Sequence, residues 1–396
     1  MTRAVDVAIV GAGIHGAGVA QAAAAAGHSV LLLEQSAVGA GSSSRSSKLI
    51  HGGLRYLETA QWRLVRESLH ERARLLRLAP ELVQLRRFLV PIYQRTRRRP
   101  WQLRLGLSLY AALAGFGRGA AFGVLDRGQW STLDGLSTDG LQRVFYYHDA
   151  QTDDRALTRA VVASARRLGA ELLCPVQCTG ATLHAEGVEL HYRQDAVEQS
   201  CRARLLINAA GPWAASFARS IHPGIPIPDV ELVQGAHIAV PGTASAGYYY
   251  LESPRDGRAI FVMPWHQELL IGTTETRFRG DPSTVSPTAA ELHYLLGVLR
   301  HYFPRYRQEL PQLRSFAGLR VLPRGPGHAF HRSRETLLIT DRAPRPRVLS
   351  IYGGKLTTWR AVAERVMQRV LGSLPARRAR ARTDQLPLAP ADDTAF

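Results

Sequence analysis

Three glycines near the start of the chain have the spacing of a turn that binds phosphate. Gly11, Gly13 and Gly16 form a GxGxxG motif between a short apolar strand and a helix of small residues. The first glycine permits a sharp turn, the second lets backbone approach a pyrophosphate, and the third lets helix and strand pack closely. A second apolar strand, 30–33, ends on Glu34, where an acid can accept hydrogen bonds from a ribose. Together these features predict a dinucleotide-binding unit.

Three later segments indicate which dinucleotide binds. Residues 39–58 read GAGSSSRSSKLIHGGLRYLE, a loop rich in hydroxyls and backbone N–H groups where an NAD-binding domain would continue with strand and helix. Residues 205–213 (LLINAAGPW) and 349–360 (LSIYGGKLTTWR) each run from a strand into a glycine turn, and Thr357 or Thr358 is a candidate helix N-cap. This pattern predicts one extended cofactor, FAD, held by both ends of the chain.

Rare residue types fall in the same segments. The 50 basic residues include only two lysines, Lys48 and Lys355, and the chain has a single asparagine, Asn208. Because the chain uses arginine elsewhere, a lysine in these segments indicates that a compact ammonium group is needed there rather than a planar guanidinium. Chance placement is the weaker explanation, because all three lie in segments that carry glycine.

The motifs GAGIHGAG, SSSRSSKLIHGGLRYLE, FYYHDAQTDDRAL, NAAGPW, QGAHIAV, GTTETRFRGDP, FAGLRVLP and YGGKLTTWR occur in family order over residues 5–372. The chain therefore resembles the FAD-dependent, aerobic-type glycerol-3-phosphate dehydrogenases, within the flavoproteins similar to D-amino-acid oxidase. It departs from the family pattern at Ala210, Glu275 and Val321. The family usually adds a helical C-terminal domain, which this sequence, ending at Phe396, is expected to lack.

The resemblance implies an α/β fold with a Rossmann-like FAD-binding domain and an antiparallel-sheet substrate domain, as in glutathione reductase and D-amino-acid oxidase. We expect the FAD-binding domain to be discontinuous, the substrate domain to follow a helical insertion, and the end of the chain, rich in proline, alanine and arginine, to be a disordered tail. The expected ranges are 1–60, 150–215 and 340–372 for the FAD-binding domain, 61–149 for the insertion, 216–339 for the substrate domain and 373–396 for the tail.

The family motifs also imply the residues that contact FAD. We expect noncovalent FAD, since no histidine or cysteine lies in a recognisable flavin-linking motif. The predicted cofactor-binding residues are Gly11, Gly13, Ile14, His15, Gly16, Glu34, Ser43, Ser46, Ser47, Lys48, Leu49, Gly211, Gly354, Lys355, Leu356 and Thr357.

Oxidation of a secondary alcohol needs a hydride acceptor, a base and, for a phosphate ester, a clamp for the anion. FAD supplies the first. His237 matches the family position of the base and is the first choice. His51 is second, because its glycine-flanked loop is expected to contact the isoalloxazine. Without the resemblance, a single histidine on a strand is better interpreted as a core histidine. Arg55, Arg320 and Arg334 match basic family positions and suit a phosphate, and Tyr56 adds a hydroxyl.

The predicted function is oxidation of sn-glycerol 3-phosphate to dihydroxyacetone phosphate, with electrons passed to a membrane quinone or to oxygen. Two alternatives remain open: a related FAD oxidoreductase acting on another 2-hydroxy acid or amine, and a flavin-binding homologue without activity.

Composition restricts the partners and the location. The net charge is +18, with basic clusters at 95–99 and 377–382, which suits an acidic substrate or anionic lipid as well as an arginine-rich solvated surface. No nucleic-acid motif accompanies this charge, and three cysteines without a metal-ligand pattern predict no metal site. Residues 105–117 are apolar but too short to span a bilayer. We expect a cytoplasmic protein, with peripheral membrane contact and a homodimer as further hypotheses.

Overall fold

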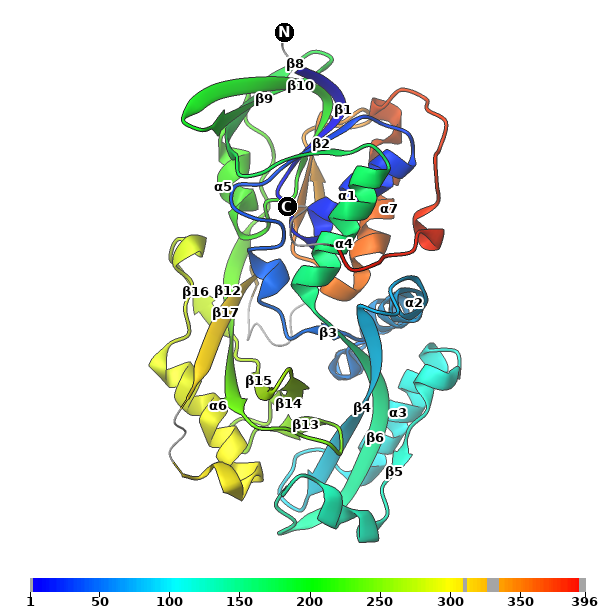
Figure 1. Ribbon diagram of the computed structural model, residues 1–396, viewed down its shortest axis with the longest axis vertical. Helices are drawn as coiled ribbons and strands as arrows, with labels where there is room; N and C mark the ends of the chain where they lie inside the picture. Colours follow the sequence, from blue (N-terminus) through cyan, green and yellow to red (C-terminus); the bar gives the residue numbers. More distant parts are fainter. Residues whose placement is uncertain (1–2, 309–311, 326–334, 392–396) are drawn as a thin grey trace.

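Two sheets divide the molecule in the computed structural model, which describes residues 3–308, 312–325 and 335–391 (Figure 1). The first sheet lies at the end that carries the N-terminus, and the second lies at the opposite end. The first sheet, within the described residues, consists of β1 (Arg3–Val10), β2 (Val30–Leu33), β7 (Glu171–Leu173), β8 (Gln177–His184), β9 (Gly187–Gln194), β10 (Val197–Asn208), β11 (Ile221–His222), β18 (Leu337–Thr340) and β19 (Val348–Tyr352).

The centre of the first sheet is parallel, with β1 between β2 and β10 and with β19 on the far side of β10. Successive residues of β1 are buried on opposite faces, as the period of a strand requires. Val7 and Ile9 pack with α1 (Ile14–Ala25), α4 (Asp154–Arg167) and α7 (Trp359–Val370), while Ala8 and Val10 pack with residues of β8 and β9. Helices on one face of a parallel sheet confirm the Rossmann-like arrangement.

The second sheet is largely antiparallel, since among the described pairs only β4 and β13 run parallel. Its strands are β3 (Leu49–Ile50), β4 (Val83–Tyr93), β5 (Gly123–Val124), β6 (Leu141–Thr152), β12 (Val230–Pro241), β13 (Tyr248–Glu252), β14 (Ala259–Trp265), β15 (Glu268–Gly272), β16 (Thr276–Phe278) and β17 (Arg314–Pro323). This sheet confirms the expected second part of the fold class.

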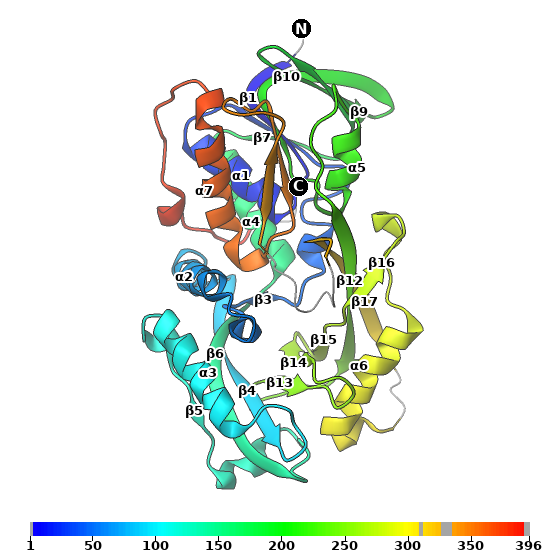
Figure 2. The same ribbon diagram turned by 180° about the vertical axis from the view of Figure 1, so that it is seen from behind.

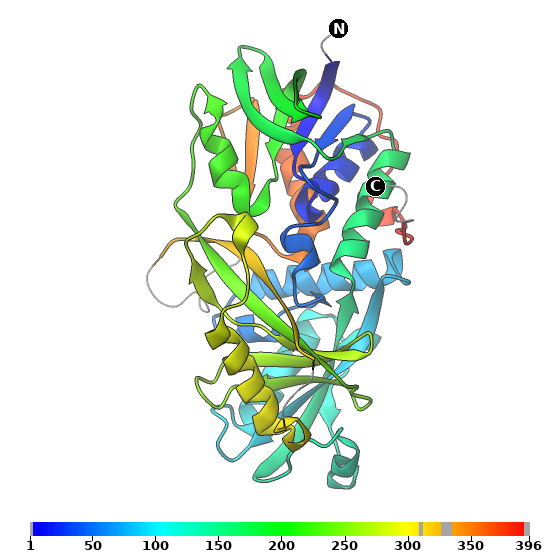
Figure 3. The same cartoon turned by 60° about the vertical axis from the view of Figure 1, so that its left-hand side comes forward.

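The range 61–149 is not the helical insertion that the sequence predicted. It contains α2 (Trp62–Leu78), α3 (Pro100–Leu113) and most of the long antiparallel pair formed by β4 and β6. In β4 the charged residues come first and a fully buried run follows. Neither half of the strand shows a clear alternation of polar and apolar residues, so the sequence pattern does not reveal the strand. Figure 2 shows α3 beside this pair, and Figure 3 shows α6 (Ala289–Tyr302, yellow) against the strands of the second sheet.

The predicted disorder of 373–396 is wrong for the residues described, which extend to 391. The backbone N–H of Arg380 donates to the carbonyl of Ala25, and that of Leu388 donates to the carbonyl of Leu78. The Leu388 side chain is buried in the same core as α1 and α7. One apolar anchor and these hydrogen bonds order a segment whose composition alone indicates a loop.

Candidate active site

A cavity of about 880 Å³ opens at the carboxyl end of β1, beside the second sheet. The predicted cofactor residues in its wall come from four separate segments, so the loops that the sequence singled out do converge. They are Gly11, Gly13, Ile14, His15, Glu34, Ser43, Ser46, Ser47, Leu49, Gly211, Gly354, Lys355, Leu356 and Thr357. Gly16 and Lys48 are not in this wall.

The glycine turn is tight enough to require glycine. Gly11 has a φ of +98°, and a Cβ there would lie 2.7 Å from the carbonyl oxygen of Ala209. A Cβ on Gly16 would lie 1.9 Å from the carbonyl oxygen of Gly11, so Gly16 serves the packing of α1 on β1. Gly13 is the N-cap of α1 and lies in the cavity wall, where a helix N-terminus favours an anionic group.

Glu34 is fixed at the wall by backbone donors. Its Oε2 accepts from the N–H of Ala12 at 2.8 Å, and its Oε1 accepts from the N–H of Ser36 at 3.0 Å. A carboxylate has about four acceptor positions, so it can also accept from ribose hydroxyls. A glycine turn at a helix N-terminus, a held acid and a cavity of this size fit an adenine dinucleotide.

Lys48 lies behind the serine-rich loop and is not in the cavity wall, and its contact with the cofactor stays a prediction. Its ammonium donates to Asp154 Oδ1 and to the carbonyl of Ser44, each at 2.6 Å. The other oxygen of Asp154 accepts from the N–H of Ser46 at 2.9 Å. Lys48 therefore holds the loop whose serines line the cavity, through a carboxylate more than a hundred residues away.

The motif GGKLTT is joined to the motif LIHGG by a threonine. Thr357 Oγ1 accepts from the N–H of His51 at 3.1 Å. The predicted capping role of Thr357 or Thr358 is not observed, because Thr358 is the N-cap residue of α7 but makes no side-chain capping bond. Lys355 Nζ lies 3.9 Å from the centre of the Tyr56 ring, so the second lysine does reach the cavity wall.

The two candidate bases occupy different positions. His51 lines the cofactor cavity, whereas His237, on β12, is buried behind it and stacks on Phe316 with ring centres 4.9 Å apart. His237 Nε2 is 2.9 Å from the hydroxyl oxygen of Ser47, which does line the cavity. Burial, followed by the positive charges of Arg320 and Lys48, lowers the pKa of His237 to about 3.

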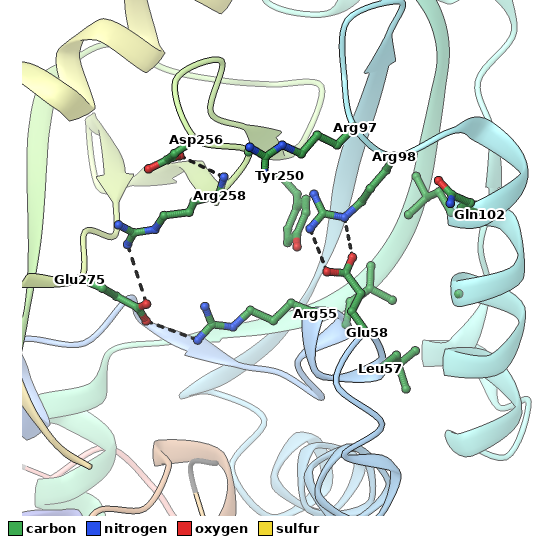
Figure 4. Close-up of a pocket in the computed structure, with 14 residues that line it drawn as sticks. Arg55, Leu57, Glu58, Arg97, Arg98, Gln102, Tyr250, Asp256, Arg258 and Glu275 are labelled. Atoms are coloured by element: carbon green, nitrogen blue, oxygen red, sulfur yellow. Dashed lines mark hydrogen bonds and ion pairs between the residues drawn. The ribbon is translucent and has the colours of Figure 1, made fainter. Parts of the chain in front are cut away.

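A second cavity, of about 770 Å³, has several arginines in its wall, and we call it the arginine-rich cavity (Figure 4). It adjoins the first cavity through residues of the two walls that contact one another. Arg55 and Glu275 line the second cavity, and their neighbours Tyr56 and Arg320 line the first. Arg55 Nη2 donates to the Tyr56 hydroxyl at 3.2 Å, and Arg320 Nη1 lies 3.6 Å from Glu275 Oε1. The predicted clamp residues Arg55, Tyr56 and Arg320 therefore come together, while Arg334 lies outside the described residues.

Both cavities also contain residues that the sequence motifs do not indicate. Val176, Gln177, Cys178 and Thr179 line the cofactor cavity because β7 lies beside β2 and the chain turns there into β8. The alternation of strand, helix and strand up to residue 173 is the sequence pattern that could have placed these residues beside the cofactor. Arg258, the residue before β14, lines the arginine-rich cavity, and no local pattern distinguishes it from the other arginines.

Comparison with known proteins identifies the family. A family profile described as FAD dependent oxidoreductase matches residues 6–360. The chain belongs to this family of FAD-dependent oxidoreductases. It is 39% identical to a glycerol-3-phosphate dehydrogenase of Pseudomonas aeruginosa over 365 residues, which are 91% of this chain and 70% of that protein. It is 35% identical to a D-erythritol 1-phosphate dehydrogenase of Brucella abortus, covering 93% of this chain and 74% of the relative.

Solved structures of FAD-dependent oxidoreductases share the fold. The glycerol-3-phosphate dehydrogenase of Bacillus halodurans complexed with FAD has a TM-score of 0.74 at 24% identity, covering 98% of this chain and 68% of that one. The L-α-glycerophosphate oxidase of Mycoplasma pneumoniae with FAD bound has a TM-score of 0.75 at 16% identity, covering 96% and 98%. FAD is the cofactor of this family, and the cavity beside β1 is shaped to hold it.

Proposed function

We propose that this FAD-dependent oxidoreductase converts sn-glycerol 3-phosphate to dihydroxyacetone phosphate. The observation that carries the proposal is the pair of adjoining cavities, in which a wall of guanidinium groups stands beside the cofactor cavity. A phosphomonoester is nearly doubly charged near neutral pH, and guanidinium groups match its geometry. Relatives named as dehydrogenases of glycerol 3-phosphate and of D-erythritol 1-phosphate support a polyol phosphate as substrate.

Different residues of the chain have different roles in this reaction. Arg55 and Arg320 bind the phosphate and so fix the position of the secondary alcohol. His237 is the proposed acceptor of the hydroxyl proton, with the Ser47 hydroxyl between its Nε2 and the cavity. FAD, when bound, accepts the hydride that leaves the carbinol carbon. The proton leaves oxygen as the hydride leaves carbon, and the C–O single bond becomes the carbonyl.

The charge of the substrate changes the basicity of His237. In the structure Arg320 and Lys48 lower its pKa, after the larger effect of burial. A phosphate dianion on Arg320 offsets one of these positive charges, so substrate binding raises the pKa of the imidazole toward the range useful to a base. The remaining candidate, His51, lies in the cavity wall and is the alternative base.

Anaerobic mixing with substrate tests the proposed function. Purified protein with FAD should lose its absorbance near 450 nm on addition of sn-glycerol 3-phosphate, and acid precipitation should release the flavin. Full FAD occupancy without reduction by saturating substrate would exclude this activity and leave the inactive homologue. Reduction by a 2-hydroxy acid or an amine in preference to polyol phosphates would favour the related oxidoreductase.

D-Erythritol 1-phosphate is the informative second substrate, because the arginine-rich cavity leaves room beyond a three-carbon chain and one relative bears that name. The ratio of the two specificity constants decides between a short and a longer polyol phosphate.

We further propose that the electrons pass to a quinone at the cytoplasmic face of a membrane. Trp101 and Leu105 on α3 and the nearby Phe116 are each exposed over 64–76% of their surface, and the chain is strongly basic. Apolar side chains among arginines suit an anionic bilayer surface. No helix in the described residues is long and apolar enough to cross a membrane.

Vesicle sedimentation tests this attachment. Binding to vesicles that contain phosphatidylglycerol should fall when Trp101 and Leu105 are both replaced by serine, and it should fall in high salt. Comparing a soluble quinone with oxygen as oxidant identifies the acceptor, and light scattering tests the proposed homodimer.

A further inference from the structure

The carboxylate of Glu275, in the wall of the arginine-rich cavity, lies between Arg55 and Arg258 (Figure 4), and Arg320 of the cofactor cavity also approaches it. Glu275 is 4% exposed and lies between β15 and β16. Arg55 Nη2 is 3.7 Å from its Oε1, Arg320 Nη1 is 3.6 Å from the same oxygen, and Arg258 Nη2 is 3.9 Å from Oε2. Three arginines far apart in sequence thus converge on one buried acid.

The charges of this group match one class of ligand. Three guanidinium groups and one carboxylate leave a double positive charge, which a phosphomonoester dianion neutralises and a single carboxylate does not. The side chains of Arg55, Arg258 and Arg320 are each less than a quarter exposed, so their attraction for an anion is weakly screened. The group therefore favours phosphate esters over 2-hydroxy acids.

The backbone on both sides of Glu275 is held by a second buried acid. Glu291 Oε1 accepts from Thr274 Oγ1 at 2.7 Å and from Thr276 Oγ1 at 2.8 Å. Burial raises the pKa of Glu291, but hydrogen bonds from Thr288, Thr274 and Thr276 outweigh it and lower the pKa below its usual value. Glu291 is therefore ionised near neutral pH and fixes the two neighbours of Glu275, which makes Glu275 a rigid point for orienting the arginines.

We propose that Arg258 is a direct ligand of the substrate phosphate, together with Arg55 and Arg320, and that Glu275 is the positioning residue that holds these three guanidinium groups toward it. This inference rests on the proposed function, since it names the phosphate subsite of the same site. The phosphate would then lie where the two cavities meet, since Arg258 lines one cavity and Arg320 lines the other.

Stopped-flow flavin reduction and calorimetry with inorganic phosphate test Arg258 separately. Arg258→Ala should raise the half-saturating concentration of sn-glycerol 3-phosphate and the dissociation constant of inorganic phosphate, each by roughly 10- to 100-fold, the loss expected for a charge-assisted hydrogen bond. Added guanidinium ion at millimolar concentration should restore part of the affinity. The FAD content should change little, because Arg258 lines the arginine-rich cavity and not the cofactor cavity.

Arg97 provides the matched control. It lines the same cavity but is exposed and is not paired with Glu275 in the described contacts. Arg97→Ala should change both constants less than about threefold, a small effect of the kind expected at a screened surface charge. Equal losses in the two variants, or unchanged constants in Arg258→Ala with full FAD content, would overturn the proposal for Arg258.

Two substitutions test Glu275, one that removes its charge and one that shortens its side chain. Glu275→Gln should weaken phosphate binding because the guanidinium groups lose their common point of attachment, and Glu275→Asp should retain more of it than the amide does. Tighter phosphate binding in Glu275→Gln would instead show that the carboxylate only competes with the anion, which contradicts a positioning role.

Phosphate calorimetry does not depend on turnover, so it separates the two proposals. Wild-type protein that binds phosphate through Arg258 but does not reduce its flavin with glycerol 3-phosphate contradicts the proposed substrate and supports the subsite. Wild-type protein that is reduced normally, with phosphate binding insensitive to Arg258, contradicts the subsite alone.

Discussion

The two adjoining cavities are built from different parts of the polypeptide. The cofactor cavity is formed largely by backbone at glycine turns, where Gly11 and Gly354 have positive φ and Gly16 lies against Gly11. Half of the 14 residues that line the arginine-rich cavity have charged side chains, and several of these form ion pairs with one another. A glycine turn of this kind has no space for a side-chain atom, so a substitution there should disrupt the cofactor cavity as a whole. Removing one of several charged side chains should instead weaken anion binding in the arginine-rich cavity by degrees.

The largest effect is expected at the glycine turn. Gly16→Ala places a methyl group where only 1.9 Å separates it from the carbonyl oxygen of Gly11, so helix and strand must move apart. We expect FAD affinity to fall more than about 100-fold, or the protein to fail to fold. Gly297→Ala, on the exposed face of α6 with no atom within 4 Å, is the control and should stabilise by about 0.5–1 kcal/mol. FAD retained at wild-type affinity in Gly16→Ala would contradict the packing requirement.

The base should give the next largest effect. His237→Ala should slow flavin reduction by roughly 10²- to 10⁴-fold while FAD remains bound, the range expected for loss of a general base. Rapid-reaction kinetics at saturating substrate measures this step. If His51→Ala causes that loss and His237→Ala does not, the two roles are reversed.

A smaller effect, on KM, is expected for the arginines that are proposed to bind the phosphate. Arg320→Ala should raise KM for sn-glycerol 3-phosphate by roughly 10- to 150-fold, since a charge-assisted hydrogen bond contributes about 1.5–3 kcal/mol. Unphosphorylated glycerol should be a poor substrate of both forms. A KM equal to that of the wild type would remove Arg320 from the clamp.

The smallest effect concerns pH and the free energy of unfolding of the FAD-free protein. Burial and neighbouring positive charge lower the pKa of His237 to about 3, and burial followed by Arg365 lowers that of His15 to about 4. Below pH 6.5 the unfolded chain binds protons that the folded protein excludes, so stability falls as pH decreases. For His237 this amounts to at most about 2 kcal/mol between pH 6.5 and 5.

Urea unfolding at several pH values measures this slope. His237→Asn should unfold with a shallower pH dependence than the wild type, and an unchanged slope would show that the imidazole is not held neutral in the folded protein.

Prediction from sequence worked where local spacing determines structure. The turn at Gly11 and the acid at Glu34 are tied by 20-odd residues of strand, helix and strand, so both could be placed before the fold was known. Lys48 was assigned to the cofactor because it lies in a glycine-bearing loop, but its partner Asp154 is 106 residues away, and no local pattern shows which way its ammonium points.

Long-range contacts explain where the predictions of structure were wrong. The order of the tail depends on Leu388 meeting α1 and α7, and Arg258 gains its place only when the strands of the second sheet bring it to Glu275. In a chain with 48 arginines, composition cannot distinguish one that converges on a buried acid from one on the surface. The strand β4 was missed for a similar reason, since pairing with β6, and not alternation of its own residues, fixes it.

The position of β19 within the chain determines when the protein can acquire its cofactor during synthesis. β1 leaves the ribosome first, but β10 lacks β19 as its neighbour, and the cavity lacks residues 353–357, until roughly 350 further residues have been made. At ordinary translation rates this delay is on the order of tens of seconds. Throughout that time the early strands present an incomplete apolar layer, which makes the nascent chain a candidate for chaperone binding, and flavin loading must wait until residues 353–357 have been made.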